Sequence, residues 1–262
     1  MAPLNKKRIM AAATQYLYIL RSDRWRLAEI FFWPSALLIV WGYAGKWAAQ
    51  NGNTTFSAVV GAAILAEVMV QTALAVSRNM LNELNSDSML SLFSTPVSIS
   101  EWAYACIPVS LITSCIVATF SSFIAWLLFG YTLLNTGWAA MPLLLNVACF
   151  GIAIGLASTA LLIYAGVRVQ TLMNIFAWVL VPLAGAYYPL EVLPGWLRRI
   201  AHALPLSPLF EILRNPQMPT SRLAYKLTIA SAGTGCYLLF SLGVLTYAFG
   251  KTLNRGIARL TY

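Results

Sequence analysis

The amino-acid sequence predicts an all-α integral membrane protein with six membrane-spanning helices, an N-terminal interfacial helix, and an outer re-entrant helical segment before the last span. Composition is the first observation behind this prediction. Of the 262 residues, 60% are hydrophobic and 10% are charged, and the mean hydropathy is +0.73, whereas a soluble domain carries roughly 25% charged residues. The second observation is that long blocks carry no charge: none lies between Glu101 and Arg168, between Arg168 and Glu191, or between Lys226 and Lys251. A spanning helix needs about 20 mostly apolar residues, and these blocks have that length or more.

The six spans are expected within a single transmembrane domain that covers residues 1–262. Their expected bounds are 28–47, 56–77, 102–129, 138–164, 170–187 and 225–250. The turn-forming stretch from Gly130 to Trp138 divides the longest apolar block into a hairpin of two helices. Pro34, Pro108 and Pro182 fall within or near spans, where neighbouring helices in a bundle tolerate them.

Residues 1–27 are predicted to form a cytoplasmic interfacial helix. Apolar residues recur there at helical spacing, at Ile9, Ala13, Tyr16, Leu17 and Leu20, and basic residues flank them. Such a pattern favours a helix that lies in the membrane surface. The alternative is a signal peptide, because a basic cluster precedes the apolar run, but Gln15 and the arginine-rich exit disfavour a cleavage site.

The distribution of Lys and Arg predicts that both termini face the cytoplasm. With that orientation, eleven of the 17 basic residues lie inside and six lie outside, as the positive-inside rule requires. The net charge of +9 is therefore explained by basic residues near the span ends, which set the orientation and contact anionic lipid. Nucleic-acid binding is not expected, because the basic residues do not cluster on a soluble module.

No cofactor, metal or catalytic site is predicted in this chain. His202 is the only histidine, the four cysteines are dispersed through apolar stretches, and no nucleophile–base arrangement is visible. The stretch Gly250-Lys251-Thr252 is similar to the end of a phosphate-binding loop. The full pattern needs a glycine where Leu245 stands, so nucleotide binding is expected on a partner instead.

The connection 78–100, between the second and third spans, is the candidate partner-binding segment. A part-apolar face with acidic residues beside it could dock into a groove on another subunit. The residues predicted to make this contact are Leu81, Glu83, Leu84, Asp87, Leu92 and Phe93. The alternative is a plain interfacial loop.

Glu67 lies near the middle of the second span, one helical turn from Gln71. A carboxylate at that depth is costly and is a functional-site hypothesis by default, so both residues are candidates for a substrate path. The alternative is a neutral, hydrogen-bonded glutamate. Gly151 and Gly155 form a GxxxG pair in the fourth span, which predicts close contact with another helix.

The segment 188–224 is too broken by proline and glycine to span the membrane. Amphipathic stretches such as 196–200 separate its prolines. Five of the six outer basic residues also fall in or next to this segment. We therefore expect short helices that enter the outer interface and return.

Three stretches together resemble the type 2 ABC exporter permeases, and this resemblance covers nearly the whole chain. The most specific stretch runs from 187 to 197 and continues to the arginine at 214, and it resembles the family pattern of aromatic–proline, Leu-Pro-x-Trp-Leu, a proline turn and a closing arginine. Its residues in the outer motif are Tyr188, Pro189, Glu191, Pro194, Trp196, Glu211 and Arg214. The stretch 92–98 resembles the coupling-helix region of the family, and 24–42 resembles the first span of a bacterial branch. Asp87 and Leu90 depart from the glycine and acidic residue that many members carry before the Thr-Pro.

The resemblance implies a permease in the bacterial cytoplasmic (inner) membrane that moves a substrate outward. It also implies a second permease copy or paralogue and cytoplasmic ABC ATPase subunits, with ATP and Mg bound on those ATPases. Two alternatives remain: a proton-coupled secondary carrier that uses Glu67, and a membrane scaffold without transport activity. The sequence does not select among polysaccharide, lipid and drug substrates.

Overall fold

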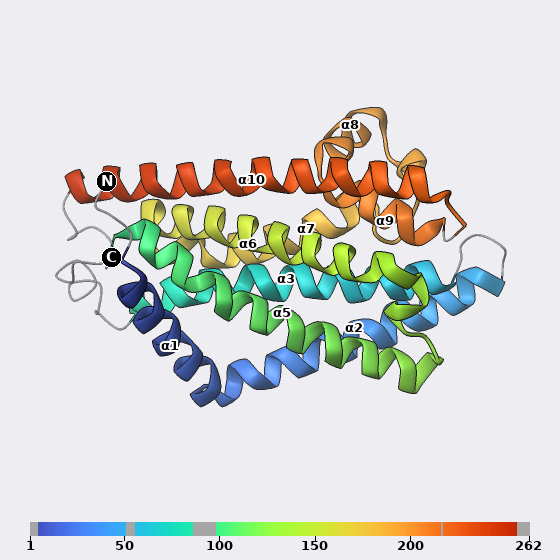
Figure 1. Ribbon diagram of the computed structural model, residues 1–262, viewed down its shortest axis with the longest axis horizontal. Coiled ribbons are helices and arrows are strands. Elements are labelled where there is room, and N and C mark those ends of the chain that lie inside the picture. The colour runs from blue at the N-terminus through green and yellow to red at the C-terminus, as the bar shows by residue number, and fades with distance from the viewer. Residues whose placement is uncertain (1–4, 51–55, 86–97, 216, 256–262) are drawn as a thin grey trace.

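The computed structural model describes residues 5–50, 56–85, 98–215 and 217–255, which form a helical bundle without strands (Figure 1). In chain order its α-helices are α1 (Lys6–Ser22), α2 (Arg24–Gln50), α3 (Phe56–Asn85), α5 (Ile99–Phe129), α6 (Ala140–Ala165), α7 (Gln170–Leu183), α8 (Gly195–Ala203), α9 (Leu206–Arg214) and α10 (Thr220–Arg255). Short 3-10 helices connect some of them: η1 (Leu133–Ala139), η2 (Val167–Val169) and η3 (Leu190–Val192). The all-α fold class is confirmed.

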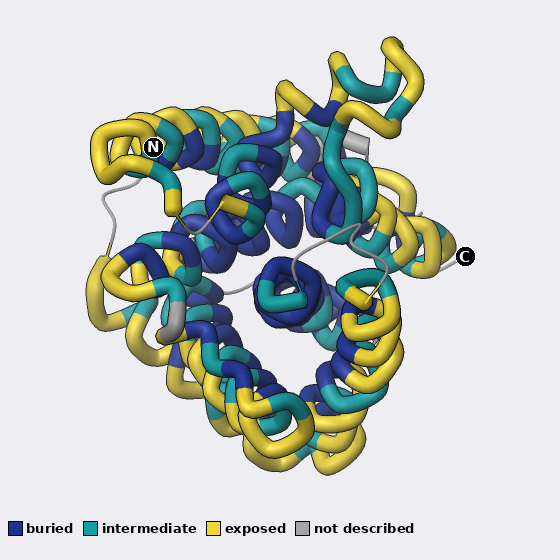
Figure 2. Tube along the Cα trace, turned by 90° about the vertical axis from the view of Figure 1, so that its right-hand side faces the viewer, coloured by how far each residue is buried: buried dark blue, intermediate teal, exposed yellow. Residues whose placement is uncertain are grey.

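Helix α3 is the central element of the bundle. It packs against α2, α5, α6, α7 and α9, and every residue from Ala58 to Ser77 is buried. Figure 2 shows that buried positions gather on the inner helices and that exposed positions lie around the outside.

The glycine pair on α6 allows a close helix contact in the bundle core. A Cβ at Gly151 would lie 2.7 Å from the backbone oxygen of Met69, and a Cβ at Gly155 would lie 2.7 Å from that of Ala73. Both glycines therefore face the backbone of α3. The close contact predicted from the GxxxG spacing is confirmed, and its partner is α3.

Helices α5 and α6 form a hairpin, and both ends of α5 carry a capping residue. The Ser98 side chain accepts a hydrogen bond from the Glu101 backbone N–H, and the Glu101 side chain accepts one from the Ser98 backbone N–H, which forms a capping box. Gly130 ends α5 in the left-handed conformation, with φ of 66°. The turn predicted between Gly130 and Trp138 is therefore confirmed, and η1 occupies it.

Five helices, rather than the six expected, are long and apolar enough to cross a membrane among the described residues. They cover Arg24–Gln50, Phe56–Leu84, Ile99–Phe129, Thr136–Ala165 and Thr220–Thr252, and they correspond to five of the predicted spans.

The sixth predicted span, 170–187, is not confirmed as one helix. Helix α7 has 14 residues, which is about 21 Å at 1.5 Å per residue, whereas a hydrocarbon core is about 30 Å thick. Gly185 stops the helix with φ of 74°, and the Ala186 N–H bonds back to the Val181 carbonyl, as in a glycine-terminated helix end.

Three boundaries also differ from the prediction. Residues 24–27 belong to α2 rather than to the N-terminal helix, and α3 continues to Asn85, eight residues beyond the expected end of the second span. Helix α10 begins at Thr220 and so takes its first residues from the segment 188–224. The rest of that segment is broken into η3, α8 and α9, as its prolines predict.

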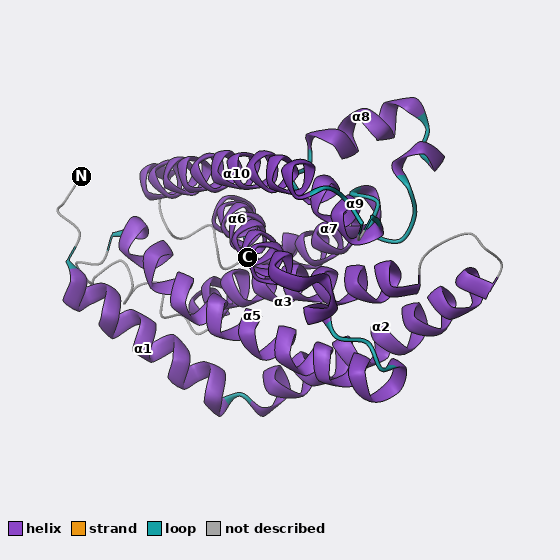
Figure 3. Cartoon of the chain, turned by 45° about the vertical axis from the view of Figure 1, so that its right-hand side comes forward, coloured by secondary structure: helices purple, strands orange, loops and turns teal. Residues whose placement is uncertain are grey.

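The bundle has two distinct ends. Helix α1, the end of α3, the start of α5 and the end of α10 share one of them, which we call the α1 end (Figure 1). Helices α8 and α9 and the start of α10 lie at the other, the α9 end. Figure 3 shows α8 on the outside of the bundle, while α9 lies closer in, packed against α3 and α10. The first and last described helices therefore reach the same end.

Candidate functional site

The predicted partner-binding segment begins as a helix rather than as a loop. Leu81, Glu83 and Leu84 lie in the last turns of α3, and each side chain is buried. The two leucines join the same core cluster as residues of α1 and α5. They are therefore part of the protein's own packing, which sequence reasoning did not foresee. Asp87, Leu92 and Phe93 lie outside the described residues.

Both helices that flank residues 86–97 are bonded to the N-terminal helix. On the α3 side, the Tyr16 hydroxyl donates a hydrogen bond of 3.2 Å to Glu83 Oε1. On the α5 side, the backbone N–H of Asn5 donates a 2.8 Å bond to Glu101 Oε1. Asn5 is itself the N-cap of α1. The N-terminal helix is therefore hydrogen-bonded to both helices that flank this stretch of the chain.

Tyr16 is suited to donate this bond. Its side chain is buried, and burial together with the negative charge of Glu83 raises the pKa of the phenol above its ordinary value of 10.0. The hydroxyl therefore keeps its proton throughout the physiological range. Because the bond joins a neutral donor to a carboxylate, it belongs to the stronger class of protein hydrogen bonds.

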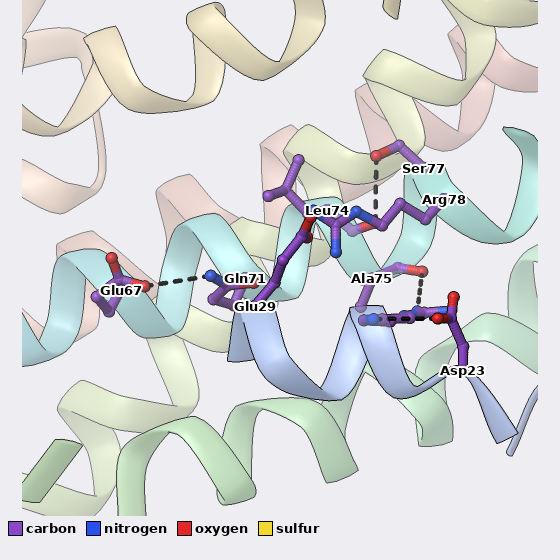
Figure 4. A network of polar contacts seen from close by, with 9 residues as sticks. Asp23, Glu29, Glu67, Gln71, Leu74, Ala75, Ser77 and Arg78 are labelled. Carbon is purple, nitrogen blue, oxygen red and sulfur yellow. Dashed lines mark hydrogen bonds and ion pairs between the residues drawn. The ribbon is translucent and has the colours of Figure 1, made fainter. Parts of the chain in front are cut away.

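A second group of polar contacts joins α2 to α3 at the same end. Arg26 is only 4% exposed, and it donates 3.2 Å hydrogen bonds to Asn79 Oδ1 and to the Ala75 carbonyl. Arg78 forms an ion pair with Glu29 (Figure 4). These bonds fix the angle between the two helices, since each guanidinium contacts a different helix from its own.

Sequence reasoning treated Arg26 only as a basic residue near a span. The spacing of Arg26 in the sequence indicates that it is buried. It lies in line with Ile30, Pro34 and Leu38, at intervals of four residues, and all four are buried. An arginine in line with an apolar stripe needs a buried partner. That partner, Asn79, is 53 residues away, and the stripe does not identify it.

Glu67 and Gln71, the predicted substrate-path residues, are enclosed in the middle of α3. Glu67 is 0% exposed and Gln71 is 2% exposed. Gln71 Nε2 donates a 3.4 Å bond to Glu67 Oε2 (Figure 4), while Glu67 Oε1 has no hydrogen-bond partner among the described residues. Nearby, the rings of Trp41 and Tyr187 stack at 3.7 Å. The role of these two residues in a substrate path stays a prediction.

The outer motif folds as a compact turn held by an arginine that sequence reasoning did not select. Arg198 on α8 donates hydrogen bonds to the carbonyl oxygens of Leu190, Glu191 and Leu193. Glu191, Pro194 and Trp196 are exposed, whereas Tyr188 and Pro189 are half-buried. The motif thus combines a rigid turn with an exposed aromatic side chain.

The last two residues of the motif lie on α9. Glu211 forms an ion pair with Lys226 of α10, and Arg214 is half-buried at the end of α9. The structure therefore brings Glu211 and Arg214 to the start of α10, and Arg214 also interacts with Glu191 of the motif.

These features define a multi-pass helical membrane protein with a polar cluster at one end and a broken segment at the other. The model of the ABC-2 type transporter family matches residues 10–218, from within α1 through α9. The chain belongs to this family and is a permease subunit of an ABC transporter. No curated protein matches the sequence.

Proposed function

We propose that this chain forms the membrane pathway of an ATP-driven exporter. A separate cytoplasmic ATPase, with ATP and Mg bound to it, would supply the energy, and a second permease copy or paralogue would complete the pathway. Family membership supports a permease. The observation that carries the energy-coupling part is that both borders of residues 86–97 are hydrogen-bonded to α1.

The orientation in this proposal places the α1 end in the cytoplasm of a bacterial cell. Basic residues gather on the elements of that end, at Arg21, Arg78 and Lys251 among others. Cytoplasmic connections of membrane proteins carry such an excess of Lys and Arg. The α9 end, with its exposed Trp196, would then face the outer interface, where tryptophan is enriched.

Helix α3 is the element that would carry a movement into the membrane. Its C-terminal end leads into residues 86–97, and its length runs through the core against the glycine face of α6. Such close packing transmits a displacement, because neither backbone has room to absorb it. When the ATPase shifts residues 86–97, α3 and α1 would move together and change the contact with the second permease copy.

The test replaces a predicted contact residue by an acidic one. Leu84 is unsuitable because it is buried and its substitution would damage the core. Phe93→Asp places the change in the 86–97 connection. Val192→Asp is the matched control, since Val192 is 72% exposed at the α9 end. The complex with the ATPase is purified, and both assembly and ATP hydrolysis are measured.

We expect Phe93→Asp to weaken assembly by about 2 kcal/mol or more, the usual size of a hot-spot loss, and to abolish permease-dependent hydrolysis. Val192→Asp should leave both unchanged. Normal assembly and hydrolysis with Phe93→Asp would contradict the proposed coupling site.

A further inference from the structure

A cavity at the α9 end that is lined in part by charged side chains is used by none of the roles described above. Its volume is about 760 Å³, and it lies between the end of α9, the connection that follows, and the first two turns of α10. Its lining residues are Glu211, Arg214, Asn215, Gln217, Met218, Pro219, Arg222, Tyr225 and Lys226. Three of these side chains are cationic and one is anionic.

The charges around the cavity do not cancel. Glu211 forms an ion pair with Lys226, which accounts for one charge of each sign. Arg222 is exposed and lines the same cavity, and no ion pair involves it within the part of the chain that the structure describes. Arg214 and Arg222 are thus the two cavity cations outside that ion pair, and the Glu191 carboxylate also acts on Arg214.

Arg214 carries the second indication of a missing partner. Its Nη2 atom is buried and has no hydrogen-bond partner among the described residues. Burial lowers the pKa of this guanidinium, while the carboxylates of Glu191 and Glu211 raise it. An arginine nevertheless keeps its charge in a protein. The buried Nη2 lies beside Gly185, 3.3 Å from the position of a Cβ there, while Arg214 itself is one of the residues that line the cavity. A buried cationic group without a full set of acceptors is costly.

The start of α10 adds to the positive potential. Arg222, Tyr225 and Lys226 all come from its first two turns. The first turn contains no acidic residue, so nothing there offsets the partial positive charge of the N-terminus of this 36-residue helix. Backbone N–H groups in such a turn commonly bind phosphate oxygens.

We propose that this cavity is an anion site for a phosphate ester. Two guanidinium groups match the several oxygens of a phosphate group better than the single plane of a carboxylate. The cavity is also much larger than a bare phosphate ion, so it has room for a glycerol or sugar next to the phosphorus. Tyr225, which is 66% exposed, supplies an aromatic surface at the rim.

The phosphate ester has two possible sources: the headgroup of an anionic membrane lipid, or a soluble glycerol or sugar phosphate. The chemistry of the site is the same for both. The site requires no ATPase and no choice of membrane orientation, so its test is independent of the proposed export function.

The test compares the intact permease with two charge-matched variants in a neutral detergent. Arg222→Gln removes one cation of the cavity at an exposed position, so folding is expected to be retained. Arg199→Gln is the control, because Arg199 is exposed on α8 at the same end of the protein but does not line the cavity. Thermal unfolding of all three proteins checks that they are folded.

Two probes distinguish the sources. Native mass spectrometry measures the retention of phosphatidylglycerol relative to phosphatidylcholine, and isothermal titration calorimetry measures the binding of glycerol 3-phosphate. We expect Arg222→Gln to weaken binding of at least one probe by about tenfold, which is typical for the loss of one charge-assisted contact. Arg199→Gln should change it less than about twofold, and added salt should weaken binding.

Each result decides the proposal. Preferential retention of phosphatidylglycerol that only Arg222→Gln removes supports a lipid headgroup site. Binding of glycerol 3-phosphate with the same dependence on Arg222 supports a soluble ligand. The proposal is overturned if neither probe binds, or if the Arg222 and Arg199 variants bind equally.

Discussion

Tyr16 on α1 donates a 3.2 Å hydrogen bond to Glu83 on α3, although 67 residues separate them in the sequence. Glu83 lies three residues before the connection that leads to α5, and the start of α5 is in turn bonded to Asn5. The N-terminal helix is therefore bonded to both sides of this connection. In the proposed mechanism, α1 moves together with α3 and α5 when the ATPase shifts the connection between them.

Replacing Tyr16 by phenylalanine tests this role. The substitution removes the hydroxyl and keeps the ring, so we expect a loss of about 1.5–3 kcal/mol of stability, the usual contribution of one hydrogen bond to a charged acceptor. Permease-dependent ATP hydrolysis should fall as well. Tyr18→Phe is the control, because Tyr18 is 73% exposed on the same helix. Thermal unfolding and ATP hydrolysis are measured for both variants. Equal effects of the two substitutions would contradict the proposed role of the Tyr16–Glu83 bond.

The Tyr16 bond also has a defined pH dependence. Its pKa in the folded protein is raised above the ordinary value of 10.0, so the protonated form is the one that folding stabilises. That contribution is complete below about pH 10 and is lost as the pH rises through the folded pKa. We therefore expect the difference in unfolding temperature between the wild type and Tyr16→Phe to be constant from about pH 6 to pH 9. A difference that declines within this window would contradict the assignment.

The glycine pair on α6 should tolerate no side chain. In Gly155→Leu, the new Cβ alone would lie 2.7 Å from the Ala73 backbone oxygen, so α3 and α6 would have to separate. Overpacking of this kind costs about 1–3 kcal/mol, and more when backbone is involved. We expect a clear decrease in unfolding temperature or in the yield of folded protein. Gly243→Leu on α10 is the control, since a Cβ there meets nothing within 4 Å.

Substitution of Glu67 distinguishes the exporter hypothesis from the proton-coupled carrier hypothesis. Glu67→Gln keeps the shape of the side chain and an oxygen that can accept from Gln71, so we expect ATP hydrolysis by the reconstituted complex to be nearly unchanged. An imposed proton gradient should have little effect on the wild type. A gradient-dependent activity in the wild type that Glu67→Gln abolishes would favour the carrier, in which a buried carboxylate at this depth binds the proton.

Membrane orientation is tested by labelling engineered cysteines in intact cells. Lys7→Cys lies on an exposed position of α1 and Arg199→Cys on an exposed position of α8. An impermeant maleimide should label position 199 from outside, and position 7 only after the cells are opened. Four native cysteines are present, two of them exposed, so the background requires a wild-type control. Labelling of position 7 alone in intact cells would reverse the topology.

Some features of this protein were determined by the sequence alone, because they depend on local composition and spacing. Long blocks without charge predicted six spans, and five of them correspond to helices of spanning length among the described residues. Gly130 with the residues after it predicted the turn between α5 and α6. The prolines of 188–219 predicted short helices, since proline interrupts a helix wherever it falls in the interior. The family resemblance rested on the same local patterns.

The tertiary structure decided which side chains meet. An apolar run does not reveal whether it will be central or peripheral, so the central position of α3 had to come from packing. The same is true of Leu81 and Leu84, whose side chains lie in the core of this chain. Their contact with a partner stays a prediction. The bonds of Arg26 to Asn79 and of Tyr16 to Glu83 join positions 53 and 67 residues apart. Only the assembled bundle brings such residues together, because helix periodicity describes neighbours three or four positions away and carries no information on distant partners.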